Sequence, residues 1–330
     1  MNLFDTTLRD GGNVVGHGFS CGLTVSMVKG LLQAGIKDIE LGNCKGLGAY
    51  DLVGATNCPS DEEYLEAIKP YLAEGRIGMF MLASCAQEDK IKNAAVAGLN
   101  FLRVGANASD GEGSIEAIKM VKAAGLVCRY SLMKAYVSTP EELADEAKML
   151  QDAGVDIITI MDSAGTMFPK DAMAYVKALK AKVTIPVGFH GHSNLGLSQA
   201  NALAAVEAGA DEVDCGLLGM ARSAGNCSTE LAAATLKKEG YLPEVDLYKL
   251  LDYLDTELIP AMEKYNYHVA VNPTDLMLGI SGCHSNKLAL IQKVAQEEKV
   301  SLLKLIADVS VIDRKNPSEE LIRETAQKLK

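Results

Sequence analysis

One short pattern recurs along the first two thirds of the chain and constrains its fold. An Ala-Gly pair ends an amphipathic helical stretch and is followed by a short β-rich run. The pairs are Ala34-Gly35, Ala97-Gly98, Ala124-Gly125, Ala153-Gly154 and Ala208-Gly209. Glycine at the end of a helix adopts the left-handed conformation that turns the chain toward the next strand. The repeat therefore predicts helices that alternate with the strands of a parallel sheet.

Three more β-rich runs bring the expected strands to eight before about residue 240. They are Asn2–Thr6, Arg76–Leu82 and Pro186–His190. Pro140–Asp152 and Pro169–Lys182 are typical of the intervening helices, because proline favours the first helical turn. Eight strands alternating with eight helices predict an α/β protein of the (β/α)8 TIM-barrel class. A doubly wound sheet is the alternative, but no G-x-G-x-x-G follows the first strand.

The chain beyond the expected barrel has no convincing strand. We therefore predict a barrel over residues 1–240 and a helical C-terminal extension over residues 241–330. Helical patterns cover Leu247–Tyr265, Ser285–Glu298 and Ser318–Lys330, and Asn272-Pro273 marks a break between the first two. The extension would serve oligomerisation or cover the active site, and we expect a homo-oligomer.

Charge and composition narrow the class of partner. The chain carries 43 acidic and 32 basic residues, a formal net charge of -11, which disfavours nucleic acid and anionic membrane surfaces. No run reaches the roughly 18 apolar residues of a membrane span, and the N-terminus lacks a signal-peptide pattern. Eight cysteines without a C-x-x-C pair predict reduced thiols. We expect a cytoplasmic protein that acts on a small molecule.

Polar residues gather where the predicted strands end, the face that carries the active site in such barrels. His190 and His192 lie two apart on strand seven, so both project to one side, and Gly191 leaves the other side empty. Strands seven, eight and one are neighbours in a closed barrel, so Asp10 and Asn226 would converge on the histidines. This set predicts a divalent-metal site with open positions for a 2-oxo acid. Mn²⁺ or Mg²⁺ suits a mostly oxygen shell, and Zn²⁺, Fe²⁺ and Co²⁺ stay open.

Several charged residues on the same face have two interpretations. Arg9 would either pair with a carboxylate such as Glu40 or stabilise an enolate oxygen, and its place beside a metal ligand favours the second. The two histidines have an alternative as ordinary rim side chains. Arg103, Lys134 and Arg222 would bind a second carboxylate or a phosphate, or would complete salt bridges.

Four segments together resemble the DRE-TIM metallolyases, the HMGL-like superfamily. They are Phe4–Gly11, Asp162–Gly165, His190–Gly196 and Gly225-Asn226. The resemblance covers the whole predicted barrel and implies a divalent metal held by Asp10, His190 and His192. It also implies a contribution from Asn226, as in some members, and an enolate stabilised by Arg9. The 4-hydroxy-2-oxovalerate aldolase branch is the most similar, and some of its members work with an aldehyde dehydrogenase partner.

The chain departs from that branch at two places. The branch has a histidine base three residues after the motif aspartate, where this chain has Asn13, which cannot accept a proton at neutral pH. His17 is the nearest replacement, with an ordinary loop histidine as the alternative. The branch also uses a C-terminal tyrosine, whereas Ser281–Asn286 resembles the S-G-x-H motif of isopropylmalate and homocitrate synthases. His284 is therefore the second candidate base.

We expect a divalent-metal-dependent aldolase that cleaves or forms a carbon–carbon bond of a 4-hydroxy-2-oxo acid through a pyruvate enolate. One alternative is a Claisen-type acyltransferase that joins an acyl-CoA to a 2-oxo acid, which His284 favours. The other is a barrel retained as a non-catalytic scaffold. The complete set of metal ligands argues against the scaffold.

Overall fold

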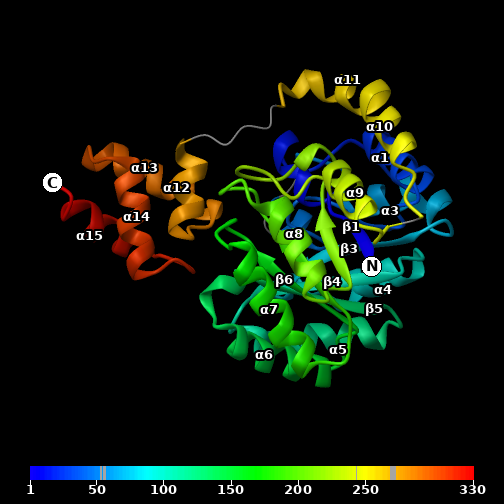
Figure 1. Cartoon of the computed structure of the whole chain (residues 1–330), viewed down its shortest axis with the longest axis horizontal. Coiled ribbons are helices and arrows are strands. Elements are labelled where there is room, and N and C mark those ends of the chain that lie inside the picture. Colours follow the sequence, from blue (N-terminus) through cyan, green and yellow to red (C-terminus); the bar gives the residue numbers. More distant parts are fainter. Residues whose placement is uncertain (53, 55–56, 243, 268–272) are drawn as a thin grey trace.

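Eight parallel strands close into a barrel in this computed structural model, which describes residues 1–330 except 53, 55–56, 243 and 268–272. Each strand pairs with the next, and β8 returns to β1. The strands are β1 (Asn2–Asp5), β2 (Asp38–Leu41), β3 (Arg76–Leu82), β4 (Phe101–Asn107), β5 (Val127–Met133), β6 (Ile157–Asp162), β7 (Val187–Gly191) and β8 (Glu212–Cys215). The predicted TIM barrel, followed by C-terminal helices, is confirmed (Figure 1).

Helices cover the outside of the barrel (Figure 1). They are α1 (Cys21–Gln33), α2 (Ala49–Leu52), α3 (Asp61–Ile68), α4 (Glu88–Val96), α5 (Ile115–Ala123), α6 (Pro140–Asp152), α7 (Pro169–Lys182), α8 (Ser198–Glu207) and α9 (Thr229–Lys238). The glycine of every Ala-Gly pair has a positive φ, from 79° to 113°. The repeat therefore marks the helix ends, as predicted. At the other end of α6, Thr139 and Glu142 form a reciprocal capping box.

Apolar side chains fill the space between strands and helices, whereas charged groups occupy part of the barrel interior. Near the carboxyl ends of the strands, fully buried Arg103 pairs with Glu40 and Asp214. Toward the opposite end, Arg129 pairs with Glu212. Unpaired buried charge is strongly unfavourable, so these pairs hold the strands in a fixed arrangement.

The C-terminal region adds helices to the barrel and then builds a second apolar core. The first group is α10 (Leu247–Tyr253), η7 (Leu254–Leu258), α11 (Ile259–Met262) and η8 (Glu263–Tyr265), which packs on the barrel core. The second is α12 (Pro273–Ser281), η9 (Ser285–Lys287), α13 (Leu288–Glu298), α14 (Leu302–Ile312) and α15 (Glu319–Gln327). Two of these helices, α12 and α14, were not predicted.

The sequence failed to predict α12 and α14 for different reasons. The sequence of α14 is apolar along most of its length, and neither an opening proline nor a closing Ala-Gly pair marks its ends. The predicted break at Asn272-Pro273 lies partly outside the described residues, and α12 begins at Pro273.

Among the described helices, none combines the length and apolar composition needed to cross a bilayer. All eight cysteines are free.

Candidate metal centre

The segment that follows β1 is fixed by its own threonines. The hydroxyl of Thr6 donates to the Cys215 carbonyl at 3.0 Å, and the hydroxyl of Thr7 accepts from the backbone N–H of Leu217 at 2.7 Å. Both bonds join the end of β1 to the end of β8 and the turn after it. Asp10 therefore lies at the rim of the barrel beside β7 and β8.

The two histidines are fixed by the end of β7 and by the loops around it. His190 lies in β7, and His192 forms an isolated β-bridge with Asn226. Gly165, with a φ of 60°, packs against this segment so closely that a Cβ there would lie 2.7 Å from the His192 carbonyl oxygen. The turn after β6 thus supports the backbone that carries His192.

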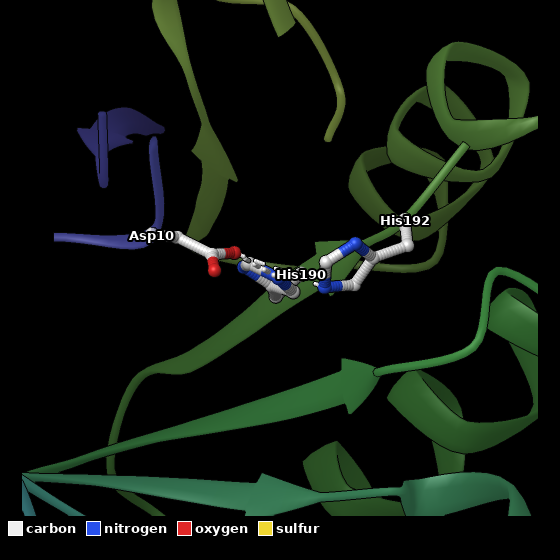
Figure 2. Close-up of side chains that lie close together, drawn as sticks. All are labelled: Asp10, His190 and His192. Atoms are coloured by element: carbon white, nitrogen blue, oxygen red, sulfur yellow. Dashed lines mark ion pairs between the residues drawn. The ribbon is translucent and has the colours of Figure 1, made fainter. Parts of the chain in front are cut away.

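Asp10, His190 and His192 converge as predicted, and their candidate ligand atoms lie within 4.8 Å of one another. Figure 2 shows the Asp10 carboxylate beside the two imidazoles, and its Oδ2 lies 3.8 Å from each Nε2. Donor atoms around one ion, with bonds of about 2 Å, are separated by similar distances. The geometry therefore suits a single cation.

Buried polar atoms at this cluster have no hydrogen-bond partner among the described residues. They include Nε2 of His190 and Oδ1 of Asn226, whose amide nitrogen donates to Asp10 Oδ2 at 3.0 Å. A buried acceptor without a partner costs about 1–3 kcal/mol. A cation held among these atoms would satisfy them, so the residues fit the divalent metal that the sequence predicts.

The protonation states also suit a metal. Burial lowers the pKa of His192 to about 3, although Asp10 opposes the shift. Burial alone would raise the pKa of Asp10, but Arg9 and the two histidines outweigh it and hold that pKa well below its usual range. Near pH 7 the site therefore offers a carboxylate and a neutral His192 imidazole, the forms that bind metal.

A chain of buried charges orients His190. Its Nδ1 lies 3.0 Å from Asp214 Oδ2, and that oxygen accepts from Arg103 at 2.6 Å. Arg103 also donates to Glu40 at 2.6 Å, and Glu40 accepts from Arg9 Nε at 2.7 Å. A carboxylate on Nδ1 favours the tautomer whose Nε2 lone pair is free for a metal. Asp214 therefore acts on the site through His190.

Arg9 makes the ion pair with Glu40 that one interpretation expects, and its catalytic role stays a prediction. Its Nε binds Glu40, and its Nη1 lies 3.2 Å from Asp10 Oδ1. The guanidinium lies over the ring of Phe80, 4.9 Å from the ring centre. Its Nη2 is buried with no partner among the described residues. Arg9 is thus rigidly held and keeps one donor for a ligand.

A cavity of about 290 Å³ opens beside the cluster. Arg9, Asp10, His190 and His192 line it, and so does His284 from the segment after α12. The C-terminal region therefore covers part of the cavity.

His17 is not among the residues that line the cavity. Its carbonyl accepts from the backbone N–H of Cys44 at 2.7 Å. Asn13 donates to the Asp10 carbonyl at 2.8 Å and thus helps to fix the loop. Of the two candidate bases, the structure brings only His284 to the cavity.

The lining also includes residues that the sequence did not single out. Lys45 follows β2, and Asn286 lies two residues after His284. Lys45 could have been predicted as a cavity residue, because it lies shortly after the end of a strand. Asn286 could not, because its place in the cavity depends on how the C-terminal region folds. Lys134 and Arg222 line the same cavity, while Arg103 completes ion pairs.

The fold and this cluster define a class: a (β/α)8-barrel protein with a candidate Asp-His-His site for a divalent metal at its carboxyl-terminal rim. The chain belongs to the HMGL-like family, whose sequence profile matches residues 1–256.

Similar proteins agree with this assignment. The 4-hydroxy-2-oxovalerate aldolase of Carboxydothermus hydrogenoformans is 33% identical over 329 residues, covering 100% of this chain and 97% of the relative. The Moorella thermoacetica enzyme of that name is 32% identical, with 100% and 96% covered. The carboxyl transferase domain from Rhizobium etli pyruvate carboxylase has a TM-score of 0.79 at 16% identity, covering 100% of this chain and 61% of that one, which shows the fold. The predicted family and the predicted class, a carbon–carbon lyase, are confirmed.

Proposed function

We propose that this protein catalyses the reversible aldol cleavage of a 4-hydroxy-2-oxo acid to pyruvate and an aldehyde. One observation carries the proposal: three side chains that could hold a metal ion and the unpartnered Nη2 of Arg9 line one cavity. An anion that forms next to a metal needs such a donor. The names of the relatives support the substrate class.

Asp10, His190 and His192, with Oδ1 of Asn226, would hold the cation. When bound, it supplies Lewis acidity that polarises the 2-oxo group of the substrate. We propose Mn²⁺ or Mg²⁺, because the substrate carboxylate and carbonyl oxygens would complete a mostly oxygen shell.

Arg9 would stabilise the charge that develops during the reaction. Breaking the C3–C4 bond leaves an electron pair that delocalises onto the C2 oxygen as an enolate. Nη2 of Arg9 donates to that oxygen, while Glu40 holds Nε of the same guanidinium. Because the group is already fixed, it does not have to reorient as the charge forms.

His284 would move the proton. It accepts the proton of the 4-hydroxyl as the C3–C4 bond breaks, which releases the aldehyde, and a proton delivered to C3 then completes pyruvate. Burial, reinforced by Arg222, lowers the pKa of His284 to about 3. Its imidazole is therefore neutral near pH 7. Its Nδ1 accepts from the backbone N–H of Asn286 at 3.2 Å, so this bond must break for Nδ1 to take the substrate proton. We prefer His284 to His17 because it lines the cavity.

The test is pyruvate release from 4-hydroxy-2-oxo acids with Mn²⁺ or Mg²⁺ present. The reverse reaction is assayed with pyruvate and a series of aldehydes. We expect metal removal, or His190→Ala, to abolish both reactions. Activity that persists without metal, or in the variant, would contradict the proposal.

A second candidate is the Claisen-type condensation of an acyl-CoA with a 2-oxo acid. The observation in its favour is His284 in the cavity. The volume of about 290 Å³ lies near the lower end of ligand pockets, roughly 300–1,000 Å³, and favours the smaller substrate. Release of free CoA from acetyl-CoA and 2-oxo acids, without aldol activity, would decide for this candidate.

The remaining alternative is a non-catalytic scaffold. If the purified protein contains stoichiometric metal and His190→Ala loses it, this result would argue against a scaffold.

Finer assignments follow from the same proposal. We propose that residues 1–240 form the catalytic barrel and 241–330 the extension, and that the protein is a homo-oligomer. Exposed apolar side chains on α10 and α11 support self-association, among them Tyr248, which is 86% exposed. Light scattering on the purified protein tests it. The aldehyde dehydrogenase partner and the cytoplasmic location stay predictions.

A further inference from the structure

The cavity carries more positive charge than the proposed reaction uses. Arg9, Lys45, Lys134 and Arg222 line it, and Asp10 is the only carboxylate among its described lining residues. The whole chain has a net charge of -11, so this excess is local. Arg9 is assigned to the enolate oxygen, and the three other cations have no role in that chemistry.

Lys134 is buried without a carboxylate partner. It is 5% exposed at the end of β5, and its Nζ donates to the Lys315 carbonyl at 2.5 Å. Asp110, which lies nearby, pairs instead with Lys315 at 2.9 Å. Among the described residues no carboxylate lies within ion-pair distance of Lys134. A buried ammonium group that lacks a counter-charge is unfavourable and would gain from an anionic ligand.

The backbone of Lys134 adds to this observation. Its φ of 57° is in the left-handed region, which lysine rarely adopts. Backbone strain of this kind is found at functional sites, where the surrounding structure maintains it. Here the strained residue places an ammonium group at the wall of the cavity.

Arg222 contributes from the loop between β8 and α9. No described carboxylate lies within ion-pair distance of its guanidinium, and the same holds for Lys45. Both Arg222 and Lys134 act on His284: after burial, they contribute to lowering its pKa. The region around His284 is therefore positive, and an anion there would reduce the field that opposes protonation of this base.

We propose that the substrate carries a second anionic group, a carboxylate or a phosphate, on its aldehyde half, and that Lys134 and Arg222 bind this group. The inference rests on the proposed aldol function and narrows its substrate class. A cavity of about 290 Å³ suits a short chain between the two anionic ends. The 2-oxo carboxylate belongs to the metal end, so these two cations are left for the other end.

Matched pairs of aldehydes test this with pyruvate and the Mn²⁺-loaded enzyme. Succinic semialdehyde is compared with its neutral isostere 4-methylpentanal, and glyceraldehyde 3-phosphate with glyceraldehyde. We expect kcat/KM to favour one anionic aldehyde by about tenfold or more, as one charge-assisted hydrogen bond would give. The pair with the larger preference identifies carboxylate or phosphate. If the kcat/KM of the anionic aldehyde, divided by that of its neutral partner, is one or less in both pairs, the inference is overturned.

Three variants assign the effect to residues. Lys134→Met and Arg222→Met remove charge at similar length, and each should lower the preference by about tenfold. Lys180→Met is the control, because Lys180 pairs with Asp211 and does not line the cavity. Its preference should equal that of the unmodified enzyme. An unchanged preference in both cavity variants contradicts the assignment.

A binding measurement separates failure of the inference from failure of the proposed function. If no aldehyde reacts, the aldol function is wrong, but the subsite can still be tested by thermal unfolding. We expect 2-oxopimelate, which has the same chain length as the adduct of pyruvate and succinic semialdehyde, to raise the melting temperature more than its neutral-ended isostere 2-oxo-7-methyloctanoate. Both cavity variants should lose the difference. Equal shifts from the two acids would overturn the subsite itself.

Discussion

Replacing Asp214 by asparagine would separate the positioning of a metal ligand from folding stability. The Asp214 carboxylate accepts from Arg103 at 2.6 Å and lies 3.0 Å from Nδ1 of His190, and all three residues are buried. Asparagine keeps the shape but loses the charge. Among the described residues, Arg103 would then pair with Glu40 alone, and the His190 tautomer would no longer be fixed.

Two magnitudes follow from these contacts. Breaking a buried ion pair costs about 3 kcal/mol or more, and at roughly 2 °C per kcal/mol for a large chain the melting temperature would fall by about 6 °C. Loss of the partner of a ligating histidine weakens metal binding about 10- to 100-fold. We therefore expect both lower stability and weaker Mn²⁺ binding in Asp214→Asn.

Glu212→Gln is the matched control. Glu212 lies on the same strand, two residues earlier, and accepts from Arg129 through both oxygens at 2.8 Å. It has no hydrogen bond or ion pair with His190 among the described contacts. It should lose stability on the order of 3 kcal/mol with Mn²⁺ affinity unchanged. Urea unfolding and calorimetric titration of metal-free protein measure the two quantities. Equal losses of affinity in both variants, or none in Asp214→Asn, would refute the reasoning.

Three further predictions concern the same site. Gly165→Ala should weaken Mn²⁺ binding by about tenfold, because the new Cβ would lie 2.7 Å from the His192 carbonyl oxygen. Gly196→Ala is the control for backbone strain, because Gly196 has a φ of 71° but no atom within 4 Å of the added Cβ. This variant should bind Mn²⁺ normally in the same titration. Arg9→Lys should lower kcat by about 100-fold through loss of the Nη2 donor, and an equal kcat in the pyruvate-release assay would contradict that role. The folded pKa of His284, about 3, is below the unfolded value of roughly 6.5, so its stability contribution is present above pH 6.5 and is lost as pH falls toward 3. Between pH 7 and 5 the metal-free protein should lose about 2 kcal/mol relative to His284→Asn in urea unfolding; parallel pH profiles would show that this histidine does not titrate as described.

The fold could be predicted because the Ala-Gly repeat depends only on local backbone conformation. Each Ala-Gly pair needs a left-handed glycine where a helix ends, and this requirement does not depend on distant contacts. Helices α6 and α7 begin at the predicted residues because proline opens each of them, and α6 ends at an Ala-Gly pair. The sequence of α14 has no such signal, and the packing of the second core determines its position.

The convergence of the candidate metal ligands was predictable because barrel closure is a property of the whole class. Once β8 pairs with β1, Asp10 must approach β7. The lining from the C-terminal region was harder to predict, because no repeat relates residues 284–286 to the barrel. The motif at His284 identified the residue, but only the folded chain shows that it reaches the cavity and that His17 does not.

The balance of charge inside the barrel explains how one cavity can be so positive. Arg9 and Arg103 share Glu40, and Asp214 completes the set, so two buried cations are matched by two buried anions. Asp10, which also approaches Arg9, remains as the carboxylate that a divalent cation would bind. No described carboxylate is then left for Lys134 or Arg222. Because buried charge requires compensation, this network leaves buried Lys134 without a counter-charge among the described residues, and this is the basis of the anionic subsite proposed at Lys134 and Arg222.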